Sequence, residues 1–382
     1  MIAGVETYKN RPTRAEISFD NLRNNLSIVR SCIQRDVKIM AMVKANAYGH
    51  GLYEISSELL KQGVEYLGVA FLEEGIYLRK SGITAPIVVL GAINTDQIAE
   101  FIQHDIEITS SSIDKSAAIA AVAKNMGKEA KVHLKIDTGM ERIGVHWYNA
   151  EKFIEQSYEM SSISIIGICS HFAKAETDHD FTAQQLNHFE SVLTILEKKR
   201  LLPEFIHIAN SAGIMNHKNS HYTMVRPGIM LYGYNPNGYL PAVRFGDRKL
   251  KPVMTLKTKV AYFKVVPAQT GISYNHTYAT GRQTRIVTLP IGYGDGYARQ
   301  LSNKGEVISR GKKYPVVGTI CMDQCMVDIG MDGSAYNGDD VLLFGEMDGS
   351  VIPLESLCDK IGTVTYEFLC GISSRVPRVY IG

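Results

Sequence analysis

Polar side chains capable of chemistry stand directly after short apolar runs of the sequence. Lys44 follows the run IMAMV and opens the segment KANAYGHG. A lysine at the end of a buried strand is partly desolvated, which lowers its pKa and favours the free amine. A free amine is the group that attacks a carbonyl carbon to form a Schiff base. Taken alone, a lysine at a strand end is more often a solvated surface group, so the residues after the other apolar runs decide between these interpretations.

Similar polar residues follow the later apolar runs. The run KVHLKID leads into TGMERIG, ISIIGICS into HFA, FIHIAN into SAG, and YTMV into RPGIM. A serine hydroxyl and backbone amides at the start of a loop or helix bind anions such as phosphate, which suits Ser211, Gly228 and Ile229. The candidate residues at these ends are Lys44, Lys135, Arg142, His171, Asn210, Ser211, Arg226, Gly228 and Ile229. Together they predict an amine and an anion-binding group in one site.

Eight apolar runs that alternate with helix-like segments predict the fold that positions these residues. The runs cover 37–43, 64–70, 85–92, 106–111, 131–137, 163–170, 205–210 and 222–227. Continuous apolar runs indicate strands buried on both faces, and alternation with helices indicates parallel pairing. Eight such units favour a closed (β/α)8 barrel, whose active site lies where the strands end in loops. The alternative is an open doubly wound sheet. Before the first run we expect a helix with Asp20 as its N-cap.

The sequence changes character after Gly233. From Met254 onward it consists of short apolar runs separated by glycine-rich turns, with one helical candidate, PLESLCDKIG. This pattern is typical of a mostly β domain. We therefore expect an α/β chain with a barrel domain at 14–240 and a C-terminal β domain at 241–382.

Composition excludes several classes of protein. Of the 382 residues 45% are hydrophobic and 21% charged, and the net charge is only +2, which argues against binding to nucleic acid or to an acidic membrane. We find neither a run of about 18 apolar residues nor a hydrophobic leader, so we expect a soluble, cytoplasmic protein. The six scattered cysteines predict reduced thiols. The histidine and aspartate groups at 178–180 and 217–221 predict solvated loops and no metal site.

A set of short motifs resembles one enzyme family. VKANAYGHG, HLKIDTGMERIG, SHFA, ANSAG, VRPGIMLYG, GISYNHTY, LPIGYGDGY, VGTICMDQ and TYEFLC are similar, in order and spacing, to the pyridoxal-phosphate-dependent alanine racemases. The resemblance runs from about Arg14 to the C-terminus. It implies a (β/α)8 barrel followed by a β domain, with the first strand at 14–19 packed against the C-terminal domain. It also implies an amino-acid substrate, pyridoxal 5′-phosphate as cofactor, and a homodimer with active sites shared between subunits.

The resemblance assigns two catalytic residues. Lys44 resembles the lysine that holds the cofactor as an internal aldimine and later serves as one acid/base, and Tyr274 resembles the second acid/base, contributed by the other subunit. Two bases on opposite faces are what racemisation needs, because the α-proton leaves one face and returns to the other. The implied product, D-alanine, serves bacterial wall synthesis.

Binding roles follow from the same resemblance. Arg226 resembles the residue at the pyridine nitrogen, with His171 beside the ring and bonded to it. Arg142 resembles the group that meets the phenolic oxygen of the cofactor and the substrate carboxylate, and Lys135 matches a position that is carbamylated in some members. Asn210 is a further cofactor-binding candidate. The implied phosphate contacts are Tyr48, Ser211, Gly228, Ile229 and Tyr366, and the implied substrate-pocket residues are Met322, Asp323 and Tyr293.

Some features depart from the pattern or leave alternatives open. Glu141 stands where a glycine is expected, and Asn275 and His276 replace small residues after Tyr274. A serine/alanine racemase shares this scaffold, although the bulky Tyr366 favours alanine. A non-catalytic carrier of the cofactor and a decarboxylase acting on a basic amino acid are the remaining alternatives.

Overall fold

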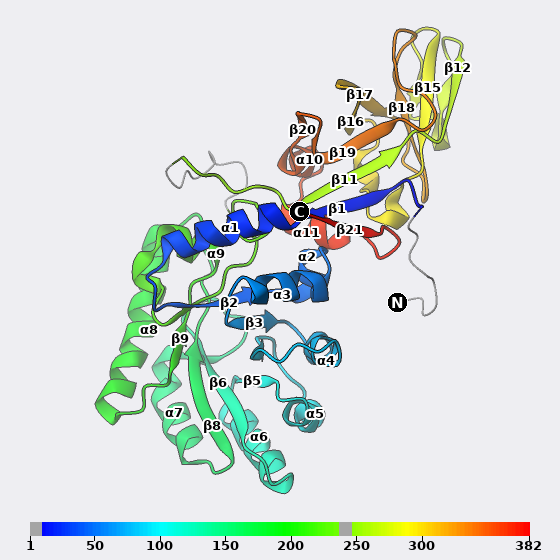
Figure 1. Ribbon diagram of the computed structural model, residues 1–382. Coiled ribbons are helices and arrows are strands. Elements are labelled where there is room, and N and C mark those ends of the chain that lie inside the picture. Colours follow the sequence, from blue (N-terminus) through cyan, green and yellow to red (C-terminus); the bar gives the residue numbers. More distant parts are fainter. Residues whose placement is uncertain (1–9, 237–246) are drawn as a thin grey trace.

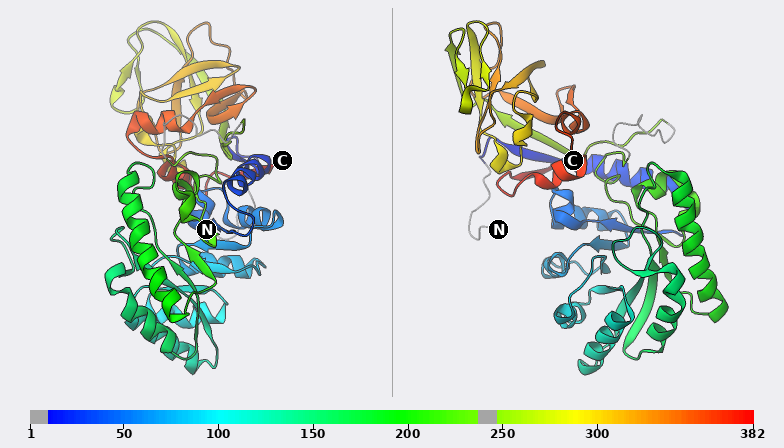
Figure 2. Two further views of the ribbon diagram at one scale, coloured as in Figure 1. Left: turned by 90° about the vertical axis from the view of Figure 1, so that its left-hand side faces the viewer. Right: turned by 180° about the vertical axis from the view of Figure 1, so that it is seen from behind.

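A parallel barrel and a β-rich domain make up the residues that the computed structural model describes, 10–236 and 247–382 (Figure 1). The expected boundary at 240/241 lies outside the described residues. Both views in Figure 2 place the two domains end to end, with residues 14–32 (blue) crossing the junction. Among the described residues, no helix is long and apolar enough to cross a membrane.

The barrel contains all eight expected strands. They pair in parallel in the order β10-β2-β3-β4-β5-β6-β8-β9, and β7 (Val145–His146) adds to β6. At the remaining seam, Arg226 N donates to Ala209 O at 2.9 Å and Thr223 N to Ile206 O at 3.3 Å. The sheet is thus a nearly closed barrel, which confirms the predicted fold. The strands are β2 (Lys38–Met42), β3 (Tyr66–Val69), β4 (Ile87–Val89), β5 (Glu107–Ser110), β6 (Ala130–Asp137), β8 (Ile163–Cys169), β9 (Phe205–His207) and β10 (Met224–Val225).

Helices cover the outside of the barrel (Figure 1). They follow the strands as α3 (Leu52–Lys61), α4 (Leu72–Lys80), α5 (Ile98–Gln103), α6 (Ile113–Asn125), α7 (Ala150–Glu159), α8 (His179–Lys199) and α9 (Ser211–Asn216). The short α2 (Lys44–Tyr48), which follows β2, contains left-handed residues and lines the barrel cavity instead. The first helix, α1 (Phe19–Cys32), begins two residues earlier than expected. Ser18, not Asp20, is its N-cap, because the Ser18 hydroxyl accepts a hydrogen bond from Asn21 N at 3.2 Å. Asp20 lies in the first turn, where a negative charge still favours the helix.

The C-terminal domain is built on a ten-stranded sheet that includes the first strand of the chain. β1 (Arg14–Ser18) pairs antiparallel with β11 and parallel with the last strand, β21. The main path is β12-β15-β18-β17-β16-β19-β11-β1-β21, with β20 on β19. These strands are β11 (Met254–Lys259), β12 (Tyr262–Val266), β15 (Thr284–Leu289), β16 (Glu306–Ser309), β17 (Lys312–Val317), β18 (Cys325–Asp328), β19 (Asp340–Met347), β20 (Ser350–Ile352) and β21 (Arg378–Ile381), and β13 (Gly271–Ile272) pairs separately with β14 (Tyr278–Ala279).

Among the described residues of this domain, two α-helices, not one, interrupt the strands. The expected helix is α10 (Leu354–Ile361), and a second, α11 (Thr365–Gly371), follows it. α11 reaches back to the barrel (Figure 1). A Cβ at Gly49 would come 2.2 Å from Leu369 O, so only glycine permits this close approach. The C-terminal domain therefore places α11 directly beside the first loop of the barrel.

Candidate active site

A cavity of about 730 Å³ opens at the carboxyl ends of the barrel strands. Its walls come from the loops after the strands and from α11. The structure thus gathers, in one chain, eleven residues that the sequence singled out. They are Lys44, Tyr48, Lys135, Arg142, His171, Asn210, Ser211, Arg226, Gly228, Ile229 and Tyr366.

Lys44 lies at the start of an unusual left-handed turn. Ala45, Asn46, Ala47 and Tyr48 all have φ between +52° and +55°. Left-handed conformation costs non-glycine residues about 1–2 kcal/mol each, so the surroundings must hold the turn. Glu74 accepts from Ala45 N at 2.6 Å, and Asn46 Oδ1 accepts from Leu52 N at 2.9 Å. Such strain is characteristic of functional sites.

The environment of Lys44 favours its neutral form. Burial lowers the pKa of the Lys44 amine, and the nearby positive charge of Arg142 lowers it further, while Glu74 acts in the opposite direction. A lowered pKa leaves a larger fraction of free amine near neutral pH, which is the nucleophilic form. The structure therefore supports the chemistry that the sequence indicated for this position.

Asp137 organises the loop that carries Arg142. Its carboxylate accepts hydrogen bonds from the backbone N–H groups of Gly139 at 2.8 Å, Met140 at 2.9 Å and Arg142 at 3.3 Å. Glu141 takes a left-handed φ of +54°, which explains why a glycine is expected there. Sequence reasoning did not assign Asp137 a role, although an aspartate followed by Thr-Gly is a typical signal for a turn held by its side chain.

Lys135 is buried in the cavity wall, in register with Cys169 of the neighbouring strand. Burial lowers the pKa of its amine to about 8, and the charges of Arg226 and Arg142 contribute in the same direction. The free amine is therefore accessible near neutral pH even at this second lysine.

Arg226 is held by several partners on the cavity floor. Nη1 donates to His207 Nδ1 at 2.6 Å, and Nη2 approaches Ser170 O at 2.8 Å, Ile208 O at 3.1 Å and His171 Nδ1 at 3.1 Å. Burial lowers the pKa of Arg226 to about 10, so the guanidinium stays protonated at neutral pH. Burial and the charge of Arg226 lower the pKa of both histidines, which are thus neutral acceptors.

A second group of polar atoms lies around Ser211 and Gly228. Ser211 Oγ accepts from Gly228 N at 3.0 Å and Met230 N at 3.3 Å, so its own hydroxyl proton is available to another acceptor. Asn210 caps α9 through Gly213 N at 2.9 Å. A Cβ at Gly228 would come 2.5 Å from Tyr48 Oη, so the absent side chain makes room for this phenol. The rings of Tyr48 and Tyr366 lie 6.2 Å apart.

The residues of the cavity fit pyridoxal 5′-phosphate. That molecule carries an aldehyde and a doubly charged phosphate, so it needs an amine and a positive environment. The wall supplies four basic side chains, two lysines and two arginines, whereas Glu176 is the one carboxylate among its described residues. Burial raises the pKa of Glu176, which weakens even this opposing charge. The charge of the cavity is therefore suited to an anionic ligand that can react with Lys44.

Four further candidates lie outside this cavity. Tyr274, Tyr293, Met322 and Asp323 belong to the C-terminal domain, and none of them lines the cavity of its own chain. Their side chains are exposed: Tyr274 by 69%, Met322 by 53% and Tyr293 by 43%. The loops that bear them are joined, because Tyr293 N donates to Cys321 O at 3.0 Å and Gly294 N to Met322 O at 2.9 Å. They form one exposed surface, called here the tyrosine surface.

The backbone at Tyr274 is strained and firmly held. Ser273 has φ +64° and ψ −169°, a region that is almost exclusive to glycine. Its hydroxyl donates to Thr319 O at 2.5 Å, while Thr319 Oγ1 donates to Tyr274 O at 3.0 Å. Sequence reasoning missed both residues, since neither type nor spacing marks a serine or threonine as an anchor.

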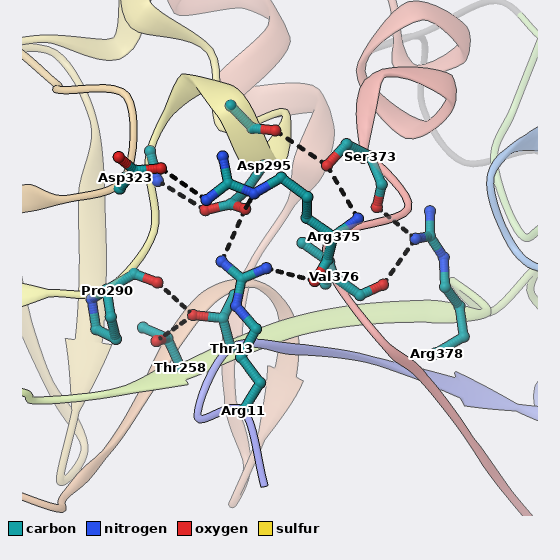
Figure 3. A network of polar contacts seen from close by, with 12 residues as sticks. Arg11, Thr13, Thr258, Pro290, Asp295, Asp323, Ser373, Arg375, Val376 and Arg378 are labelled. Atoms are coloured by element: carbon teal, nitrogen blue, oxygen red, sulfur yellow. Dashed lines mark hydrogen bonds and ion pairs between the residues drawn. The ribbon is translucent and has the colours of Figure 1, made fainter. Parts of the chain in front are cut away.

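A buried carboxylate, Asp295, lies in a polar network with Arg375 and Asp323 (Figure 3). Asp295 is fully buried and pairs with Arg11 at 2.7 Å and Arg375 at 3.3 Å. Arg375 in turn pairs with Asp323 at 2.6 Å. Arg11 also donates to Arg375 O, so the two arginines are linked as well. Asp295 therefore connects the N-terminal segment, the C-terminal segment and the loop that carries Asp323.

The family models for the alanine racemase N-terminal domain and the alanine racemase C-terminal domain match residues 17–236 and 253–380. The chain is 42% identical over 373 residues to alanine racemase 2 of Caldanaerobacter subterraneus subsp. tengcongensis, covering 97% of this chain and 95% of the relative. Among solved structures, the alanine racemase of Clostridium difficile 630 has a TM-score of 0.92 at 39% identity, covering 98% of this chain and 96% of that one. The alanine racemase from Bartonella henselae with covalently bound pyridoxal phosphate has a TM-score of 0.86 at 29% identity, covering 97% of this chain and 99% of that one.

Proposed function

Because the chain belongs to the alanine racemase family, we propose that it interconverts L-alanine and D-alanine with pyridoxal 5′-phosphate as cofactor. The observation that carries the proposal is the barrel cavity, in which the Lys44 amine has a lowered pKa and lies among three further cations. The cofactor, when bound, supplies an aldehyde for Schiff-base formation and an electron sink that acidifies the α-proton of the amino acid.

Different residues of the cavity have different proposed roles in binding and proton transfer. Lys44 would hold the cofactor and then move a proton at the α-carbon, a role that its lowered pKa favours. Arg142 would bind the substrate carboxylate, and Arg226 would donate to the ring nitrogen while keeping its own proton. The cofactor phosphate would be bound by residues of the cavity wall, with Asn210 and His171 completing the cofactor site; these phosphate-binding residues are Tyr48, Ser211, Gly228, Ile229 and Tyr366.

The second base must reach the opposite face of the substrate. Burial raises the pKa of Tyr48 and of Tyr366, so the two phenols in the cavity hold their protons and are poor bases. Tyr274 is exposed on the tyrosine surface of its own chain. We infer that the enzyme is a homodimer in which Tyr274, Tyr293, Met322 and Asp323 of one subunit cover the cavity of the other. Each active site is then completed by its neighbour.

Lys135 is proposed to carry a carbamate. Its amine has a pKa of about 8 and is therefore partly unprotonated at neutral pH. The free nitrogen attacks the carbon of carbon dioxide and releases one proton, which converts the neutral amine into a carbamate anion. Two arginines, Arg142 and Arg226, lie close enough to affect its pKa and would stabilise that anion.

The same proposal extends to the use of the product, the substrate preference and the cellular compartment. D-alanine from this reaction would serve peptidoglycan synthesis, and Tyr366 in the cavity wall supports a preference for alanine over serine. The six cysteines are all free thiols, which supports a reducing compartment such as the cytoplasm.

Chiral chromatography of the amino acids formed from L-alanine and from L-serine tests this function. Protein saturated with pyridoxal phosphate should racemise alanine with the higher kcat/KM, and borohydride should fix the cofactor on the peptide containing Lys44. The variant Lys44→Ala is the control. A higher kcat/KM for serine would reassign the substrate, and a lack of racemisation in cofactor-saturated protein would refute the proposal.

A further inference from the structure

A chain of buried side chains connects Arg226 to a glutamate on the far side of the barrel. His207 Nε2 lies 3.0 Å from His133 Nδ1, and His133 Nε2 lies 3.0 Å from Glu107 Oε2. With the 2.6 Å contact between Arg226 and His207, these bonds link four side chains on β5, β6, β9 and the loop after β10. Glu107 and Arg226 are 3% and 4% exposed, and both histidines are fully buried. We call this the Glu107–Arg226 chain.

The direction of every hydrogen bond in this chain follows from its arginine end. A guanidinium can only donate, so His207 Nδ1 must accept, and its proton must be on Nε2. His207 then donates to His133 Nδ1, which places the proton of His133 on Nε2. That proton needs a buried acceptor, and the carboxylate of Glu107 is the group in position. Both imidazoles are thus fixed in one tautomer by the groups at the two ends.

The barrel leaves space for the chain at a single glycine. Gly167 on β8 pairs with His133 on β6, and β8 separates β6 from β9 in the sheet. A Cβ at Gly167 would come 2.1 Å from His133 Nδ1, the atom that accepts from His207. A side chain at this position would therefore displace the bond in the middle of the chain.

We propose that Glu107 is a positioning residue for the racemase reaction, acting on Arg226 through His133 and His207. The inference rests on the proposed function in placing Arg226 at the cofactor ring. Without an acceptor at Glu107, the proton of His133 Nε2 is unsatisfied in a buried site. If that proton moves to His133 Nδ1, every hydrogen bond of the chain reverses its direction. His207 then carries its proton on Nδ1 and presents a donor, not an acceptor, to Arg226. The guanidinium would then lose its contact with His207, one of those that fix its position in the cavity.

Two variants of Glu107 separate the acceptor from the charge. E107Q keeps an oxygen that accepts from His133 but removes the charge, whereas E107L removes the acceptor as well. Since a hydrogen bond to a charged group has an effect of roughly tenfold, we expect kcat to fall by about tenfold in E107L and less in E107Q. KM for alanine should remain unchanged, because Glu107 lies outside the cavity. E58Q, which removes the charge of another buried glutamate of the barrel domain, is the matched control.

Nitrogen NMR of the holoenzyme labelled with 15N-histidine gives a readout that does not require turnover. Signals are assigned by their loss in H133Q and H207Q. In the wild type, both Nδ1 atoms should be unprotonated, and E107L should change the protonation of at least one of them while E58Q changes neither. A protonated Nδ1 in wild-type His133 or His207 would overturn the proposal, as would E107L with wild-type kcat and unchanged tautomers. If E107L fails to fold, the wild-type tautomers decide, because a protonated Nδ1 in His133 or His207 overturns the proposal without any variant of Glu107. An inactive wild type would refute the proposed function, whereas the tautomers test the chain itself.

Discussion

Replacement of Lys135 by methionine should stabilise the protein at neutral pH in buffer free of carbon dioxide. Burial lowers the pKa of Lys135 from 10.5 to about 8. Each pKa unit corresponds to about 1.4 kcal/mol, so burial of the charged amine costs the folded protein about 3 kcal/mol. Methionine has a similar length and no charge, so it removes this cost. The gain is an order-of-magnitude figure for a side chain that is 7% exposed.

The sign of the effect depends on pH. Below pH 8 the amine is protonated in both states, and the wild type carries the whole cost. Between the folded pKa of about 8 and the unfolded value of 10.5, the unfolded chain binds the proton and the folded one does not, so wild-type stability rises. The advantage of Lys135→Met should thus be about 3 kcal/mol at pH 7 and vanish by about pH 10.5.

Urea unfolding at a fixed protein concentration measures this difference across the pH range. Lys131→Met on the same strand is the control, because Lys131 is exposed and forms only a surface ion pair with Asp105. Added bicarbonate should reduce the advantage of Lys135→Met, since a carbamate that forms only in the folded wild type stabilises it. Equal stability of wild type and Lys135→Met at pH 7 without carbon dioxide would refute the predicted cost of burying the Lys135 charge. If bicarbonate does not change the stability difference, the proposed carbamate on Lys135 is refuted.

Three more substitutions test other parts of the site. Lys44→Ala should abolish borohydride fixation of the cofactor and its visible absorbance band, and retention of the band would show that another residue holds the cofactor. Tyr274→Phe should impair proton transfer in one direction more than in the other, measured as solvent isotope effects from each enantiomer; equal effects would argue against two bases. Asp295→Asn removes a buried carboxylate from two ion pairs, so the free energy of unfolding should fall by about 2–4 kcal/mol. The loss is smaller than for fully buried pairs because Arg375 is partly exposed. An unchanged Tm in thermal unfolding would contradict this prediction.

The barrel could be predicted because its sequence pattern, an apolar run followed by a helical segment, is repeated eight times. Strands buried on both faces require continuous apolar runs, and the helices between them exclude antiparallel pairing. Residues such as Lys44 and Arg226 could be located for the same reason, since parallel strands end at one edge. The N-cap of α1 was misplaced by two residues because Ser18 and Asp20 are both good caps and only geometry distinguishes them.

Other features depend on contacts that no local pattern encodes. α11 was missed because its residues, TYEFLCG, form a helix of only seven residues that is held by the barrel. The left-handed turn after Lys44 contains Ala45 and Ala47, whose types give no sign of a positive φ. The pairing of Asp295 with Arg11 and Arg375 joins positions at opposite ends of the chain. Such features are determined by the packing of the two domains rather than by neighbouring residues.

The shared active site is the central claim, and subunit complementation tests it most directly. Lys44→Ala and Tyr274→Phe are each expected to be nearly inactive, but a mixed dimer has one intact site, built from Lys44 of one subunit and Tyr274 of the other. Unfolding the two variants together and refolding them at equal amounts should restore about a quarter of wild-type activity, because about half of the dimers are mixed and each has one working site of two. If the mixture remains as inactive as the separate variants, Lys44 and Tyr274 do not meet across a dimer and the account is wrong.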